Sequence, residues 1–201
     1  MRLFILSRHG ESTLNVEGRV NGDPAVSVPL TETGREAAKR LGAQLAGVPI
    51  DLCVHSRFGR ARETAELAIG GRETPSIVEP LLDDIDVGDL DCRPVEEYRA
   101  WKEAHSRADA VPGGESLDDA ARRYVRAFRR LLARDEQTVL VVCHEIPVRY
   151  ALNAAGGSDD LDGPVHQIGN AMPYLFTSGS LERAAARMEA LVGGTRAMDA
   201  E

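Results

Sequence analysis

The sequence predicts an α/β fold with a mostly parallel central sheet that is covered by helices on both faces. Short apolar runs rich in Val, Ile and Leu alternate along the chain with longer segments whose apolar residues recur every three or four positions. Several of these runs also stop abruptly at Arg, His, Ser or Asp. Such endings are typical of strands whose carboxyl ends form the functional edge of a parallel sheet.

Five runs are the expected strands, because each is short, apolar and enriched in β-branched, leucine or aromatic residues. They cover 2–7, 50–55, 76–79, 138–143 and 172–177. Helical segments separate most of them, and strands joined by helical crossovers run parallel.

Five segments with helical spacing are the expected helices, at 31–46, 58–69, 94–106, 116–134 and 146–155. Thr31 and Ser116 are suitable N-terminal caps, and Asp119 follows Ser116 three residues later. The segment 116–134 has the clearest apolar series: Ala120, Ala121, Tyr124, Val125, Phe128, Leu131 and Leu132. We expect this series to pack in the core rather than to bind a cofactor.

Length and composition favour one domain over residues 1–201. The chain is 43% hydrophobic and 28% charged, which allows one sizeable core. Its formal net charge of −8 disfavours nucleic acid and anionic membranes as partners, since both need a basic surface.

The same features predict a cytoplasmic protein. No apolar run is long enough to span a bilayer, and Met1 leads directly into a short expected strand rather than a signal peptide. Cys53, Cys92 and Cys143 are an odd, widely spaced set, which favours reduced thiols. No close ligand pair accompanies Cys143 and His144, so no metal site is expected there.

Two irregular stretches are candidate lids over a crevice. Residues 18–29 are polar and rich in Gly and Pro, and residues 90–115 contain Tyr98, Trp101, His105 and a Pro-Gly-Gly turn. For Tyr98 and Trp101, packing of a surface helix is favoured slightly over substrate contact.

The C-terminal segment 180–201 is expected to form a helix followed by a polar tail. One helical face carries Leu181, Ala184, Ala185, Met188 and Leu191. This face could dock on the domain or on another subunit, which leaves a homodimer open.

The first expected strand ends at Arg8-His9-Gly10-Glu11, which is the most informative junction in the chain. Gly10 permits a turn without a Cβ in the way. The His9 imidazole carries a lone pair near neutral pH, and the adjacent Arg8 opposes its protonation while attracting an anion. The pair therefore suits attack on a phosphoryl group, although an isolated match is more often a capped strand end.

Three further segments, each placed after an apolar run, strengthen this interpretation. They are Ser56-Arg57-Phe58-Gly59-Arg60-Ala61-Arg62-Glu63-Thr64-Ala65, Asp84-Ile85-Asp86-Val87-Gly88 and Val141-Val142-Cys143-His144-Glu145. Together with Arg8-His9-Gly10-Glu11 and Asn15, they resemble the motifs of the histidine phosphatase superfamily, in its short phosphatase branch. Pro112-Gly113-Gly114-Glu115-Ser116 and Asn170 also fit. The resemblance spans positions 2 to about 176 in the family's order, and it implies a three-layer α/β/α sandwich like that of phosphoglycerate mutases.

The resemblance and the demands of phosphoryl transfer together suggest a role for each group. A loose phosphoryl transition state needs cationic donors around its oxygens, and Arg8, Arg60 and His144 supply them, with Asn15 as a neutral donor. His9 is left to attack in line and form a phosphohistidine. Neither a metal nor a cofactor is required.

Asp84 is the expected general acid for the leaving alcohol and the later base for water. This assignment depends mainly on its spacing to Gly88, and Asp83 and Asp86 are close rivals.

The chain departs from the family pattern at two positions, and the departure at Glu145 affects substrate choice more than catalysis. The family's Leu-x-Glu-x-x-x-Gly motif corresponds to Leu82-Asp83-Asp84-Ile85-Asp86-Val87-Gly88, with Asp84 in the Glu place. Glu145 follows His144 where glycine is usual. The Glu145 side chain could intrude on the phosphate site or accept a hydrogen bond from a substrate hydroxyl. Arg57 and Arg62 are expected on a solvated helix face. His55 could face the pocket, but a capped strand end is at least as favoured.

Three functions remain. The favoured one is a phosphomonoester hydrolase that acts on a small phosphorylated metabolite through a phosphohistidine. A phosphoglycerate mutase is the second, but its Glu-Arg-x-Tyr-Gly motif with a following Gly-x-x-Lys is missing. The third is a non-catalytic phosphate-binding module, which is disfavoured because His9 and its partners are all present.

Overall fold

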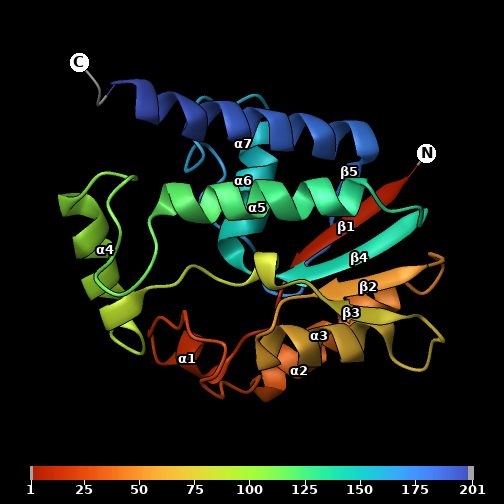
Figure 1. Ribbon diagram of the computed structural model, residues 1–201. Helices are drawn as coiled ribbons and strands as arrows, with labels where there is room; N and C mark the ends of the chain where they lie inside the picture. The colour runs from red at the N-terminus through yellow and green to blue at the C-terminus, as the bar shows by residue number, and fades with distance from the viewer. Residues whose placement is uncertain (1, 199–201) are drawn as a thin grey trace.

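The structure, a computed structural model, describes residues 2–198, with side chains through residue 193. Five strands alternate with helices along the chain (Figure 1). The strands are β1 (Leu3–Arg8), β2 (Leu52–His55), β3 (Ser76–Val78), β4 (Thr138–Cys143) and β5 (Tyr174–Thr177). The helices are α1 (Thr13–Val16), α2 (Glu32–Gln44), α3 (Gly59–Ile69), α4 (Val95–Ala104), α5 (Leu117–Leu132), α6 (Glu145–Ala155) and α7 (Ser178–Met198), with two 3₁₀ turns at Pro80–Leu82 and Gly88–Leu90.

The strands form one sheet in the order β3-β2-β4-β1-β5. The first four strands are parallel, and β5 pairs antiparallel with β1 at one edge. The expected α/β fold with a mostly parallel sheet is therefore confirmed.

Helices cover both faces of the sheet and so form three layers, with α2 and α3 on one face and α5, α6 and α7 on the other (Figure 1). Alternate strand residues enter the two cores: Phe4 and Leu6 pack on the α5 side, and Ile5 packs on the α2 side. Because the strands are buried on both faces, they are continuous apolar runs in the sequence.

Strand register fixes which residues meet at the carboxyl edge of the sheet. Arg8 lies opposite Cys143, so the residues that follow them, His9 and His144, leave the sheet at the same level. His55 is paired with Val142, one position earlier, which brings Ser56 to the same edge.

Close backbone approach requires glycine at the turn after β1. A Cβ on Gly10 would lie 2.5 Å from the carbonyl oxygen of Gly34 in the first turn of α2. The backbone at Gly10 thus packs directly on that helix, whose N-cap Thr31 accepts a hydrogen bond from the Gly34 amide. This contact, rather than a special backbone angle, is the reason for Gly10.

The apolar face of the C-terminal helix is used within the chain. Leu181, Ala184, Ala185 and Met188 are fully buried, and α7 packs against α5 and α6. The helix begins at Ser178, two residues before the expected start, and it continues through Gly193 and Gly194 to Met198, where a polar tail was expected. Residues 199–201 lie outside the described residues. No helix among residues 2–198 combines the length and apolar character needed to cross a membrane.

Candidate active site

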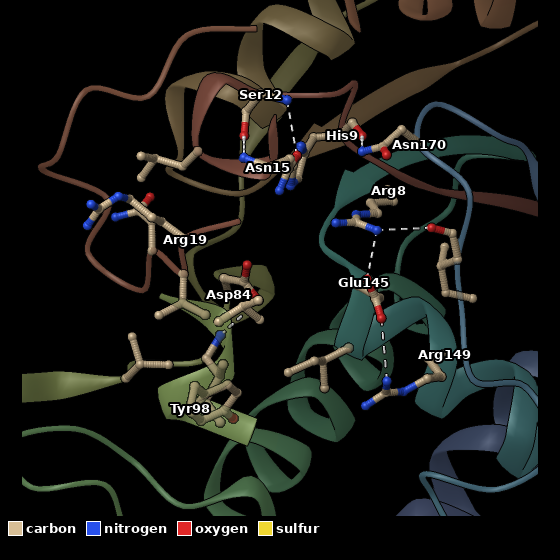
Figure 2. Close-up of a pocket in the computed structure, with 18 of the residues that line it drawn as sticks. Arg8, His9, Ser12, Asn15, Arg19, Asp84, Tyr98, Glu145, Arg149 and Asn170 are labelled. Atoms are coloured by element: carbon tan, nitrogen blue, oxygen red, sulfur yellow. Dashed lines mark hydrogen bonds and ion pairs between the residues drawn. The ribbon is translucent and has the colours of Figure 1, made fainter. Parts of the chain in front are cut away.

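A cavity of about 640 Å³ opens at the carboxyl edge of the sheet (Figure 2). Its wall includes residues that follow β1 and β4, residues of the 18–29 loop, and residues of α4. Six of the seven sequence-predicted site residues line it, namely Arg8, His9, Asn15, Arg60, Asp84 and Glu145. His144, the seventh, is fully buried just behind this wall, where its ring packs at 5.3 Å from that of His9.

His9 is held in one tautomer, with the lone pair of its Nε2 directed at Arg60. Its Nδ1 lies 2.7 Å from the carbonyl oxygen of Gly10, which can only accept, so Nδ1 carries the proton. Nε2 then accepts a hydrogen bond from Arg60 Nε at 3.0 Å. Burial and the charge of Arg60 lower the pKa of His9 well below its usual range. His9 is therefore neutral, and its Nε2 carries a lone pair that faces Arg60.

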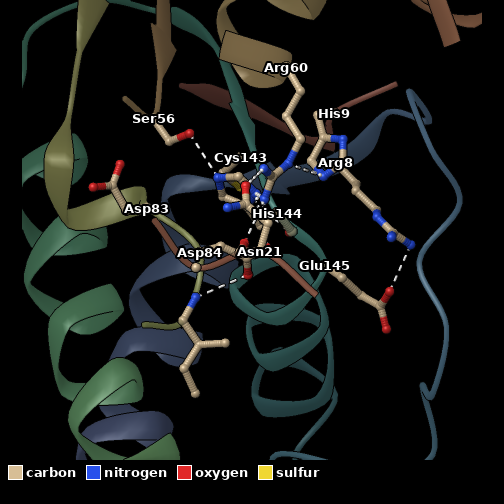
Figure 3. Close-up of polar contacts among 12 residues, drawn as sticks. Arg8, His9, Asn21, Ser56, Arg60, Asp83, Asp84, Cys143, His144 and Glu145 are labelled. Atoms are coloured by element: carbon tan, nitrogen blue, oxygen red, sulfur yellow. Dashed lines mark hydrogen bonds and ion pairs between the residues drawn. The ribbon is translucent and has the colours of Figure 1, made fainter. Parts of the chain in front are cut away.

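Arg60 is the centre of the polar network (Figure 3). The residue is only 4% exposed, and besides His9 it donates to the Asn21 side-chain oxygen at 2.5 Å and to Asp84 Oδ2 at 3.1 Å. Phe58 supports the guanidinium from one side, with its ring centre 4.3 Å away. Burial lowers the pKa of Arg60, but the adjacent Asp84 opposes this.

The Ser-x-x-x-Arg-Ala-x-x-Thr motif has a clear structural basis. Thr64 Oγ donates to the Arg60 carbonyl and accepts from the Gly10 amide at 2.9 Å, which ties α3 to the His9 turn. Ser56 Oγ lies 2.8 Å from His144 Nε2. The motif thus positions both histidines as well as supplying Arg60.

The fully buried His144 pairs with Asp84, which is half-buried. His144 Nδ1 lies 3.2 Å from Asp84 Oδ2, the same oxygen that Arg60 contacts. Burial lowers the pKa of His144, against the raising effect of Asp84. For Asp84, burial alone would raise the pKa, but His144 and Arg60 together hold it well below its usual range. Asp84 is therefore a carboxylate in the free protein.

The structure separates the three rival carboxylates. Asp83 accepts from the Arg57 amide at 2.8 Å and pairs with the Arg57 guanidinium at 2.6 Å, so it is committed to that residue. Asp86 is exposed and caps the Gly88 amide. Of the three, only Asp84 contacts His144 and Arg60.

Arg8 lies on the cavity wall but is bound to protein groups. Its Nη1 donates to the Ile168 carbonyl at 3.1 Å and lies 2.7 Å from Glu145 Oε2. The other oxygen of Glu145 lies 3.4 Å from Arg149 Nη1. Glu145 therefore bridges two arginines, as Figure 2 shows.

Asn15 presents a donor to the cavity. The Ser12 amide donates to its Oδ1 at 3.0 Å within a capping box that starts α1. With the oxygen occupied in this way, the Nδ2 group is the part of the amide that remains for a ligand.

Two asparagines contribute more than the sequence indicated. Asn21 holds Arg60 from the 18–29 loop, and Asn170 donates to the His9 carbonyl at 2.8 Å. Asn170 fits a family motif, but nothing in the sequence distinguishes Asn21 from other polar residues of its loop.

Other sequence-predicted residues lie outside the site. Arg62 is exposed beside Glu66, and Arg57, which is also exposed, pairs with Asp83. His55 Nδ1 lies 2.7 Å from the Ser56 carbonyl at the end of β2. His105 stacks on Trp101 at the surface. Among residues 2–198, no group of three or more His, Cys, Asp or Glu side chains is placed to hold a metal ion.

Comparisons with known proteins show the family to which the chain belongs. Residues 4–190 match the model of the histidine phosphatase superfamily (branch 1). Adenosylcobalamin/alpha-ribazole phosphatase from Salmonella typhimurium is 37% identical over 155 residues, which cover 72% of this chain and 74% of that protein. A 2,3-bisphosphoglycerate-dependent phosphoglycerate mutase from Methylobacterium is 29% identical over 87% of this chain and 90% of its own length.

A solved structure shows the same fold. The crystal structure of the alpha-ribazole phosphatase from Shigella flexneri matches with a TM-score of 0.76 and 27% identity, and it covers 87% of this chain and 90% of its own. The chain belongs to the histidine phosphatase superfamily, branch 1, as its motifs predicted.

Proposed function

We propose that this protein hydrolyses phosphomonoesters of small metabolites through a phosphohistidine formed on His9. The observation that carries the proposal is the neutral His9 Nε2, which faces the buried Arg60 guanidinium at the wall of a cavity. The similarity to a Salmonella phosphatase over 72% of the chain supports it.

The free site already contains a carboxylate where a phosphoryl oxygen would bind. Arg60 Nη2 and His144 Nδ1 both contact Asp84 Oδ2, at 3.1 and 3.2 Å. A substrate phosphoryl group takes over these donors and that of Arg60 Nε, which exposes the His9 lone pair. Asp84 then loses the two partners that lower its pKa and gains an anionic neighbour, so substrate binding promotes its protonation.

The first chemical step transfers the phosphoryl group to the protein. His9 Nε2 attacks phosphorus, a P–N bond forms and the P–O ester bond breaks. Arg8, Arg60, His144 and Asn15 donate to the non-bridging oxygens, where the charge is located. Asp84 gives its proton to the leaving oxygen, which departs as the alcohol.

The second step releases phosphate. Asp84, now ionised, accepts a proton from a water molecule as that water attacks phosphorus and the P–N bond breaks. Inorganic phosphate forms, and His9 returns to its neutral state.

The proposal is tested with a panel of phosphate esters, assayed with and without a chelator. We expect turnover of phosphomonoesters to be unchanged in the chelator, because arginine and imidazole donors provide the stabilisation that a metal would otherwise supply. The measurement is phosphate release over time. Loss of activity in the chelator that a divalent cation restores would contradict the metal-independent mechanism.

A phosphoglycerate mutase is the second candidate, favoured by the 29% identity to the Methylobacterium enzyme over 87% of the chain. This function requires return of the phosphoryl group to a second hydroxyl. Incubation with a phosphoglycerate separates the two, since a mutase yields the isomer whereas a hydrolase yields inorganic phosphate.

Glu145 is expected to compete with substrate for Arg8. Glu145→Gln removes the charge paired with Arg8, so the KM for phosphate esters should fall by up to about fivefold, the scale of a half-exposed ion pair. The kcat should change less. Glu79→Gln, which breaks a pair with Arg130 outside the cavity, is the matched control. A raised KM would instead show that Glu145 accepts a hydrogen bond from the substrate.

We also propose that the protein works in the cytoplasm with reduced thiols. Cys53, Cys92 and Cys143 are unpaired in the structure, and burial raises the pKa of Cys53 and of Cys143 to about 12, which makes both thiols unreactive. A homodimer remains a prediction that sedimentation of the purified protein tests.

A further inference from the structure

The motif Pro112-Gly113-Gly114-Glu115-Ser116 takes no part in the proposed chemical steps, but it packs on the segment 81–88, which carries Asp84. A Cβ on Gly88 or on Gly114 would collide with the backbone of the other segment. Close backbone approach of this kind requires glycine. The turn at 112–115 therefore lies against the Asp84 segment with no side chain of either glycine between them.

Glu115 links this turn both to the Asp84 segment and to α5. Its amide donates to the Asp86 carbonyl at 2.9 Å, and its Oε1 accepts from the Asp86 amide at 3.1 Å. The same carboxylate is paired with Arg123 of α5, whose Nε donates to Oε2 at 3.2 Å. Both side chains are half-buried, so water and salt screen this pair less than a pair at the surface. Glu115 thus orients the Arg123 guanidinium.

Arg123 holds the main chain on both sides of Asp84. Its Nη1 donates to the carbonyls of Leu81 at 3.0 Å and Asp83 at 2.9 Å, and its Nη2 donates to the Asp84 carbonyl at 3.1 Å. The carbonyls of Asp83 and Asp84 belong to the two peptide groups that flank the Asp84 Cα. Because the guanidinium is a rigid planar fork, it fixes both peptide groups at once and so the direction in which the Asp84 side chain points.

The position of Arg123 separates it from the groups that would touch the substrate. Arg123 does not line the active-site cavity but lines a second cavity of about 620 Å³, and Asp84 lies on the wall of both. An effect of Arg123 on the reaction is therefore expected to pass through the Asp84 segment.

Support for this segment matters most when the substrate is bound. In the free protein, Arg60 and His144 hold the Asp84 carboxylate (Figure 3). In the proposed reaction the phosphoryl group takes over both of these donors. The Ile85 amide still donates to Asp84 Oδ1, at 3.1 Å, but this amide belongs to the same segment. The position of the acid then depends on the backbone that Arg123 holds.

We propose that Arg123, oriented by Glu115, is a positioning residue for Asp84. It keeps the carboxyl group within reach of the leaving oxygen after the substrate has taken over Arg60 and His144. This inference rests on the proposed function for the reaction that Asp84 assists. The motif at 112–116 then serves the general acid rather than the phosphate.

Two esters compared within each variant test the proposal. In Arg123→Gln, the kcat/KM for an alkyl phosphate should fall on the order of 10- to 100-fold more than that for p-nitrophenyl phosphate, because a misplaced acid matters most where the leaving group needs a proton. The ratio of the two kcat/KM values does not depend on the fraction of the variant that is folded. Equal losses for both esters would overturn the positioning role and leave the phosphatase function intact.

Arg122, the neighbour of Arg123 on α5, offers a matched control. It pairs with Asp119 and donates to the Val192 carbonyl at 2.8 Å, away from the Asp84 segment. Arg122→Gln should therefore leave the ratio of the two esters unchanged. A change in that ratio as large as in Arg123→Gln would assign the effect to α5 as a whole and overturn the proposal.

Two further variants separate position from charge. Arg123→Lys keeps the positive charge but lacks the planar fork, so the shift in its ester ratio should lie between those of the parent and of Arg123→Gln. Full recovery by lysine would assign the effect to charge alone. In Asp84→Asn protein, which has no acid to position, Arg123→Gln should slow both esters equally. A difference between the esters that persists there would overturn the proposal.

Hydrogen exchange measured by mass spectrometry tests the contact without a substrate. Arg123→Gln should speed exchange in the peptide that contains residues 83–88, whereas Arg122→Gln should not. Unchanged exchange in Arg123→Gln would overturn the positioning role even if the protein hydrolyses no ester. Absence of turnover by the parent protein, in contrast, would contradict the proposed function.

Discussion

Substitution of His9 by alanine is expected to abolish phosphomonoester turnover, with a loss of roughly 10⁴-fold or more, because it removes the nucleophile of both steps. The physical reason is that Nε2 of His9 is unprotonated. Its lone pair is free of a proton at neutral pH, since burial and Arg60 lower the pKa of His9. Among the described residues that line the cavity, His9 is the only histidine that a hydrogen bond joins to Arg60.

The covalent step gives a direct measurement. Brief incubation of the parent protein with a ³²P-labelled ester, followed by an alkaline quench, should trap acid-labile phosphate on the protein, and His9→Ala should trap none. His105→Ala is the control, because His105 stacks on Trp101 and does not line the cavity. Appreciable hydrolysis by His9→Ala would exclude the phosphohistidine and favour direct attack by water.

The sequence predicted the part of this site that depends on strand ends. His9, Ser56 and His144 each follow an apolar run, and parallel register brings the ends of these runs to one edge. Their meeting therefore required only the strand assignments and a mostly parallel sheet. Arg60 follows from the same logic, because it lies in the first turn of the helix after β2.

The other contacts of the site are made by loops, whose sequences have no periodic pattern from which a structure could be predicted. Asn21 reaches Arg60 from the 18–29 loop, and its position is fixed by Asp91, which accepts from the Gly22 amide at 2.6 Å. That contact joins two irregular stretches about seventy positions apart, so the sequence pattern could not place it. The short helix α1 was missed for a related reason, since four residues are too few to show helical spacing.

The ion pairs of the site could not be predicted from the sequence either. Glu145 was identified as a departure from the family pattern, but its partner could not be named, because Arg8 and Arg149 lie on different elements. For Tyr98, the sequence favours packing of a surface helix only slightly over substrate contact. The structure places it in the core and on the cavity wall together.

Asp84→Asn is expected to slow esters of poor alcohol leaving groups by about 10²–10⁴-fold, the usual size of general-acid assistance. p-Nitrophenyl phosphate should slow far less in its first step, because its phenolate leaves with little help from a proton. The substitution is nearly isosteric, and the remaining side-chain oxygen can still accept from Arg60. The variant therefore lacks the acidic proton that Asp84 would give to the leaving oxygen, while the phosphate pocket is largely preserved.

Asp83→Asn and Asp86→Asn are the matched controls for this assignment. Asp83 is committed to Arg57, and Asp86 is exposed beside Gly88, so neither substitution should produce a loss that depends on the leaving group. Single-turnover rates with an alkyl phosphate and with p-nitrophenyl phosphate measure that dependence for all three variants. Equal losses for both esters in Asp84→Asn would assign it to phosphate binding, because a lost binding contact slows both reactions alike. A selective loss in either neighbour would move the general acid to that residue.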